Sequence, residues 1–120
     1  MAKILLVDDE YSVRLTLREF MLDMGHNVDA AESVSEALVL VDKKEYDLII
    51  TDILLPKITG IQFLQKLRSQ GHNMAAIVMT GEPTQQTHDA AGALGVIDYL
   101  IKPVKKADIE SVVRRALESV

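Results

Sequence analysis

Five polar residues directly follow short apolar runs of this sequence, and their side chains suit phosphate chemistry. They are Asp8, Asp9, Asp52, Thr80 and Lys102. Two carboxylates about 4 Å apart repel by roughly 4 kcal/mol at an effective dielectric constant near 20, so three that meet require a cation among them. Oxygen ligands without Cys or His favour Mg²⁺, and an ammonium and a hydroxyl suit a phosphoryl group. If these side chains converge, they favour Mg²⁺-assisted transfer of a phosphoryl group onto Asp52.

The elements that must position these residues alternate along the chain. Apolar runs predict strands at residues 3–7, 26–30, 47–51, 75–79 and 96–101. Apolar residues at helical spacing predict helices at residues 11–24, from 33, from 60 to near 71 and at 106–119. Residues 84–94 are expected to form a weak helix with little apolar stripe. Because the strands are apolar without alternation, we expect both faces of the sheet to be covered. The pattern predicts an α/β, doubly wound fold with a five-stranded parallel sheet and five helices.

In such a sheet the five polar residues share one edge, because ligands bind outside the carboxyl ends of the strands, near the point where strand order reverses. Each residue alone has an ordinary structural explanation: an Asp such as Asp9 commonly caps a helix, and Thr80 is a common strand residue. Three carboxylates, a hydroxyl and an ammonium at one edge are better explained by a shared site.

Length and composition exclude several classes of protein. The 120 residues are a single-domain length, so we expect one domain over residues 1–120. The absence of Cys excludes disulfide scaffolds and Cys-ligated metals. The net charge of −5 opposes direct binding of nucleic acid. No apolar run approaches the length of a membrane helix, and the N-terminus lacks a secretory apolar region, so we expect a cytoplasmic protein.

Four motifs resemble those of the receiver domain of two-component response regulators, and the resemblance covers the whole chain. They are residues 4–10 (ILLVDDE), 51–60 (TDILLPKITG), 79–81 (MTG) and 98–103 (DYLIKP). Their order and separations make the signal specific. The resemblance implies the flavodoxin-like strand order 2-1-3-4-5. It also implies a signalling switch rather than an enzyme, with residual autophosphatase activity only.

The resemblance further implies the role of each site residue. Asp52 would be the phosphoacceptor, and Asp9, Asp52 and the backbone carbonyl of Leu54 would hold Mg²⁺. Asp8 would act on the ion largely through water.

The remaining implied roles concern the phosphoryl group and the switch. Lys102 would pair with the phosphoryl group, and the Lys102–Pro103 bond would be cis. Thr80 would hydrogen-bond the phosphoryl group in the active state, while Tyr99, the switch aromatic, would exchange an exposed ring position for a buried one.

The resemblance implies two kinds of partner. A sensor histidine kinase or a histidine phosphotransfer protein would donate the phosphoryl group. A downstream effector protein or domain would read the face formed by the helix 84–94, the strand 96–101 and the last helix, and a homodimer formed on phosphorylation is compatible with that face. The helix 84–94 contains Gly92 and few apolar residues, so we expect its position to be labile.

Two positions flank the phosphoryl group and tune its lifetime in such proteins. Leu54 lies two residues after Asp52, and Glu82 lies two residues after Thr80. A leucine cannot position the hydrolytic water, so we expect no strong self-dephosphorylation.

Three alternatives remain at this point. A Mg²⁺-dependent phosphatase of the haloacid-dehalogenase type would have a second Asp where Leu54 stands. A flavodoxin-like FMN module would have a Ser/Thr/Gly-rich loop in place of Asp8 and Asp9, which repel phosphate. A degenerate receiver that takes no phosphoryl group is disfavoured because all five polar residues are present.

Overall fold

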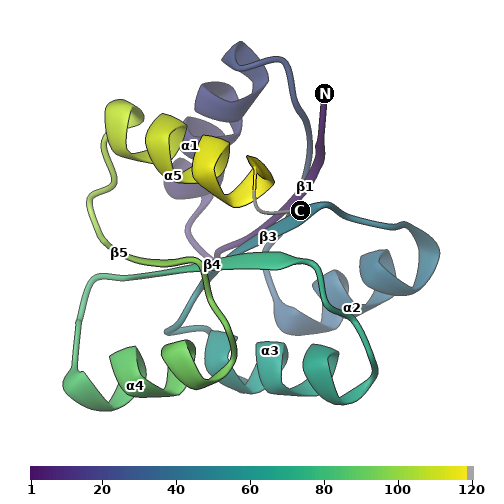
Figure 1. Cartoon of the computed structure of the whole chain (residues 1–120), viewed down its shortest axis with the longest axis vertical. Helices are drawn as coiled ribbons and strands as arrows, with labels where there is room; N and C mark the ends of the chain where they lie inside the picture. Colours follow the sequence, from purple (N-terminus) through teal and green to yellow (C-terminus); the bar gives the residue numbers. More distant parts are fainter. Residues whose placement is uncertain (119–120) are drawn as a thin grey trace.

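The computed structural model describes residues 1–118 and consists of parallel strands alternating with helices (Figure 1). The strands are β1 (Lys3–Val7), β2 (Asn27–Ala31), β3 (Leu48–Asp52), β4 (Ala75–Thr80) and β5 (Asp98–Ile101). The helices are α1 (Tyr11–Asp23), α2 (Val34–Lys43), α3 (Gly60–Ser69), α4 (Gln85–Ala93) and α5 (Lys106–Glu118). The strand order is β2-β1-β3-β4-β5, with every pair parallel, which confirms the predicted fold.

The sheet is the middle of three layers, because alternate residues of its strands are apolar on both faces. Figure 1 shows α1 and α5 on one side of the sheet and α2, α3 and α4 on the other. Leu5 and Ile49 pack with Phe63 beneath the second group of helices. Ile4 and Ile50 belong to the core under α1 and α5. In the described part of the chain, no helix is long and apolar enough to cross a membrane.

The strand boundaries differ slightly from those that periodicity predicts. β2 lies one residue later than predicted, and β5 begins at Asp98 rather than at residue 96. The backbone N–H of Val96 donates to the carbonyl of Ala91 at 3.3 Å, and Gly95 has a φ of 72°, so these residues close the end of α4 before the strand starts. The predicted end of the last helix at residue 119 lies outside the described residues.

Candidate functional site

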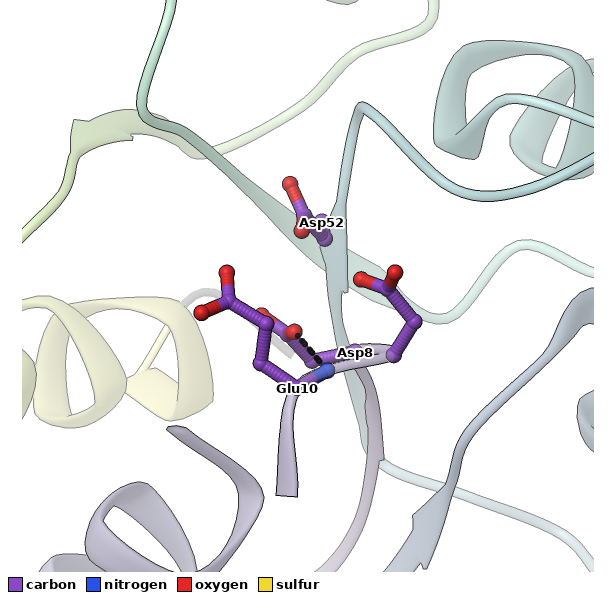
Figure 2. A group of neighbouring side chains, drawn as sticks. Asp8, Glu10 and Asp52 are labelled. Atoms are coloured by element: carbon purple, nitrogen blue, oxygen red, sulfur yellow. Dashed lines mark hydrogen bonds between the residues drawn. The ribbon is translucent and has the colours of Figure 1, made fainter. Parts of the chain in front are cut away.

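The strand ends bring the predicted polar residues to one edge of the sheet. Asp8 directly follows β1, Asp52 and Thr80 end β3 and β4, and Lys102 follows β5. Figure 2 shows the carboxylates of Asp8, Glu10 and Asp52 gathered at this edge, although more than 40 residues separate the first two from the third. The fold therefore produces the convergence that the sequence predicts.

The Lys102 ammonium binds the carboxylates of this edge to one another. Its Nζ lies 2.7 Å from Asp8 Oδ2, 2.9 Å from Asp52 Oδ2 and 3.4 Å from Glu10 Oε1. Burial lowers the pKa of Lys102, but the hydrogen bonds and charges of Asp8 and Asp52 outweigh burial and raise it above its ordinary value. The side chain is therefore a fixed positive charge beside Asp52. The Lys102–Pro103 peptide bond is cis, as expected.

Asp8 is a fully buried carboxylate with one poorly satisfied oxygen. Its Oδ1 accepts a hydrogen bond from the backbone N–H of Glu10 at 2.9 Å. Within residues 1–118, Oδ2 accepts no hydrogen bond of normal geometry, although the Lys102 ammonium lies 2.7 Å away. Burial raises the pKa of Asp8, and the contacts with Lys102 and the N–H of Glu10 offset only part of that rise. Buried polar atoms are normally satisfied, and Oδ2 relies on the charge of the Lys102 ammonium for this.

The acidic residues at this edge fit a hard divalent cation. Asp8, Asp9, Glu10 and Asp52 can each offer one carboxylate oxygen, all within 4.8 Å of one another. Oxygen donors of this kind suit Mg²⁺, which retains several waters when it binds a few carboxylates. Glu10 was not among the predicted site residues, although its place in the uninterrupted acidic run Asp8-Asp9-Glu10 could have indicated it.

The loop after β3 approaches Asp52 closely. The backbone N–H of Leu54 donates to Asp52 Oδ1 at 3.3 Å, and the hydroxyl of Thr51 donates to the Asp52 carbonyl at 3.0 Å. The N–H of Gly60, the first residue of α3, donates to the carbonyl of Ile53 at 2.9 Å. A Cβ at Gly60 would lie 2.0 Å from the Asp52 carbonyl oxygen, so only glycine permits this approach. The start of α3 thereby fixes the backbone of Asp52.

Thr80 and Tyr99 do not meet in the structure. Thr80 is buried, and its hydroxyl accepts a hydrogen bond from the backbone N–H of Glu82 at 3.0 Å. On the neighbouring strand Tyr99 pairs with Val78, so it lies two positions away from Thr80 in register. Its side chain is half-buried rather than exposed, and its hydroxyl contacts α4 and not the acidic residues.

Comparison with known proteins gives a consistent result. The family model of the response regulator receiver domain matches residues 4–114. The two-component response regulator PhoP of Pseudomonas aeruginosa is 33% identical over 109 residues, which cover 91% of this chain and 48% of PhoP. The chain spans about half the length of the curated relatives it matches.

Solved structures with the same fold include two response regulators. The chemotaxis response regulator CheY4 of Vibrio cholerae has a TM-score of 0.90 and 30% identity, and the match covers 98% of this chain and 99% of that one. The response regulator TrrA of Thermotoga maritima, solved in complex with Mg²⁺-BeF, has a TM-score of 0.87 and 29% identity, with 98% and 100% covered.

The comparisons support neither the aspartate phosphatase nor the FMN-binding module that the sequence left open. The family match spans nearly all of the described chain, and the strand order and the acidic edge agree with it. This chain belongs to the receiver domains of two-component response regulators.

Proposed function

We propose that Asp52 accepts a phosphoryl group from a phosphohistidine, and that the single domain spanning residues 1–120 thereby changes its output face. The observation that carries the proposal is the position of the Asp52 carboxylate, 2.9 Å from the Lys102 ammonium and within a group of four acidic residues. Receiver domains bind Mg²⁺ at an acidic pocket, and response regulators interact with histidine kinases and effectors.

The chemistry is an in-line displacement at phosphorus. An oxygen of Asp52 attacks the phosphorus of the phosphohistidine, so that a P–O bond forms while the P–N bond breaks, and the released imidazole takes a proton from water. Lys102 then pairs with the negatively charged phosphoryl oxygens. They replace the Asp52 carboxylate, which is its partner in the unphosphorylated protein. Asp9, Asp52 and the carbonyl of Leu54 would hold Mg²⁺, and Asp8 would act on it through water. When bound, the ion neutralises charge between the acidic groups and the phosphoryl group.

The proposed partners follow from the family. A sensor histidine kinase or a histidine phosphotransfer protein donates the phosphoryl group in the cytoplasm. An effector protein or domain, or a second copy of the chain, binds the face formed by α4, β5 and α5 after phosphorylation. Because Leu54 is exposed beside Asp52 and cannot orient a water, self-dephosphorylation is slow.

The test is phosphorylation of the purified protein by acetyl phosphate in the presence of Mg²⁺. Intact-mass measurement should show one added phosphoryl group, and hydroxylamine should remove it because the product is an acyl phosphate. Trapping of the labelled residue and peptide mapping should place the group on Asp52. A stable ester on Ser or Thr, or no label at all, would contradict the proposal.

Magnesium affinity should depend unequally on the two neighbouring acids. Asp9 is exposed at the site, whereas Asp8 is buried and already bound to Lys102, so Asp9 is placed to be a direct ligand. We expect Asp9→Ala to weaken Mg²⁺ binding more than Asp8→Ala. Calorimetric titration measures both affinities, since the chain has no Trp. Equal or reversed losses would contradict the assigned roles.

Communication from Asp52 to the output face should require the Thr80 hydroxyl. A phosphoryl group carries about −1.5 to −2 charges and forms strong charge-assisted hydrogen bonds, so it should draw this hydroxyl away from the N–H of Glu82. We expect beryllofluoride with Mg²⁺ to shift amide signals over residues 81–106. Thr80→Ala should still accept a phosphoryl group but lose most of the distant shifts. Retention of those shifts in the variant would exclude a route through Thr80.

A further inference from the structure

The Tyr99 hydroxyl is bound by the first turn of α4. Its oxygen lies 2.7 Å from Thr87 Oγ1 and accepts a hydrogen bond from the backbone N–H of Thr84 at 3.3 Å. The ring of His88 packs edge-on against the Tyr99 ring, with centroids 5.1 Å apart. Tyr99 therefore contacts three residues at one end of this helix, and Thr87 makes the shortest of these contacts.

Thr87 has a second role at the same place, because it belongs to the cap of α4. The side chain of Thr84 accepts from the backbone N–H of Thr87 at 3.1 Å. The Thr87 hydroxyl also lies 2.9 Å from Thr84 Oγ1 and 3.2 Å from the Thr84 carbonyl. The side chains of Thr84, Thr87 and Tyr99 thus form a hydroxyl cluster, in which Thr87 Oγ1 is shared between the helix cap and the Tyr99 side chain.

The two ends of α4 are held to the domain by different contacts. Its buried side chains are limited, within the described residues, to Ala91 near its C-terminal end. That end is also tied to the body of the domain, because the Arg68 guanidinium donates to the carbonyl of Leu94 at 3.3 Å and to that of Met74 at 2.8 Å. The N-terminal end has the hydroxyl cluster instead. Tyr99 is therefore the principal side chain that holds the start of α4.

We infer that the Thr87 hydroxyl is a positioning group that holds Tyr99 against α4 in the unphosphorylated protein and thereby sets the population of the switched state. The inference rests on the proposed function and on the role that the family resemblance implies for Tyr99, whose ring would move inward after phosphorylation. Inward movement must break the bond between the Tyr99 and Thr87 hydroxyls. The same event releases the start of α4, while Arg68 keeps its other end in place.

Thermodynamic linkage gives the expected size of the effect. A neutral hydrogen bond changes an equilibrium about 2- to 12-fold. Suppose that a substitution removes this hydrogen bond and that the bond exists only in the unswitched state. The ratio of switched to unswitched protein then rises by that factor. Any ligand that favours the switched state then binds more tightly by up to the same factor. Thr87 should therefore oppose activation without touching the phosphoryl group.

The first experiment uses the free protein, so that it does not depend on phosphorylation. The chain has three Tyr residues, which makes the Tyr99 ring resolvable after ¹³C-tyrosine labelling. Thr87→Val removes the hydroxyl at similar volume, and Thr87→Ser keeps it. We expect Thr87→Val to move the Tyr99 ring signals away from the wild-type position, and Thr87→Ser to leave them near it. Where the beryllofluoride complex forms, the signals of Thr87→Val should move toward their position in that complex. Gln86→Ala, at an exposed position of the same helix, is the control for general loosening of α4.

The second experiment measures beryllofluoride affinity in the presence of Mg²⁺. Thr87→Val should bind about 2- to 12-fold more tightly than wild type, and Thr87→Ser should bind within about twofold of it. In a Tyr99→Phe background, Thr87→Val should produce no further change, because the bond is already absent. A thermal melt of each variant checks that it is folded.

The outcomes separate the inference from the proposed function. If wild type binds no beryllofluoride, the proposed function is wrong, and the Tyr99 signals of the free protein still decide whether Thr87 holds the ring. If wild type binds but Thr87→Val leaves both the affinity and the Tyr99 signals unchanged, the inference is wrong. An equal gain in affinity in the Tyr99→Phe background would also overturn it, because the effect would not pass through the Tyr99 hydroxyl.

Discussion

An Asp52→Asn variant should take up no phosphoryl group from acetyl phosphate, whereas wild type should take up one. An amide is a far weaker nucleophile than a carboxylate, and it offers no negative oxygen for phosphorus or for Mg²⁺. The loss should be complete, because the proposal gives the acceptor role to none of the other three carboxylates of the group. Intact-mass measurement after incubation with Mg²⁺ gives the result directly.

A matched control exists on the same strand segment. Asp47 immediately precedes β3, at the end of the strand opposite Asp52, and its Oδ2 accepts from the backbone N–H of Lys3 at 2.8 Å. Asp47→Asn keeps an acceptor oxygen for that bond and should be phosphorylated like wild type. The Asp52→Asn variant should remain folded, since Lys102 keeps its 2.7 Å contact with Asp8. Label that persists in Asp52→Asn would move the acceptor to another residue.

Gly60→Ala should destabilise the domain and impair phosphorylation together. The added Cβ would lie 2.0 Å from the carbonyl oxygen and 2.9 Å from the carbonyl carbon of Asp52, both of them backbone atoms that cannot rotate away. Either the start of α3 or the end of β3 must move. Overpacking of this kind costs about 1–3 kcal/mol, and more when the backbone must shift. Urea unfolding measures the stability, and acetyl phosphate measures the reactivity of Asp52.

Gly92→Ala provides the contrast for this substitution. Gly92 lies within α4, and a Cβ there would meet no atom within 4 Å. Alanine should raise the free energy of unfolding by about 0.5–1 kcal/mol, because Gly is the poorer helix former. A Gly60→Ala protein as stable and as reactive as wild type would show that the backbone of Asp52 does not depend on this contact.

The convergence of the acidic residues and Lys102 was predictable, because it follows from parallel strands and their carboxyl ends. Periodicity located each strand, and a polar residue after each apolar run placed Asp8, Asp52, Thr80 and Lys102 on the same edge. The start of β5 was placed two residues early, because Val96 is apolar but its N–H closes the preceding helix. Apolar character alone does not show whether such a residue begins a strand or closes the preceding helix.

Other features depend on distances that the sequence does not contain. The 2.7 Å contact between Lys102 and Asp8 results from how β1 and β5 lie across the sheet. The contact between Tyr99 and Thr87 requires the exact position of α4, a helix whose sequence specifies it weakly. In the sequence Gly60 resembles any turn glycine, and only the structure shows that a Cβ there would collide with the carbonyl of Asp52.

The closure of the loop between Asp52 and Gly60 also limits how this site can diversify. The N–H of Gly60 binds the carbonyl of Ile53, and its Cα lies against the Asp52 backbone, so both ends of residues 53–59 are joined in a ring. Lys57 within this ring has a φ of 69°, unusual for a residue with a side chain. An insertion or deletion would have to preserve this closure to keep the Asp52 backbone in place. Exchange of side chains leaves the closure intact, so we expect it to be the main route by which the loop varies, with Leu54 as the exposed position nearest the chemistry.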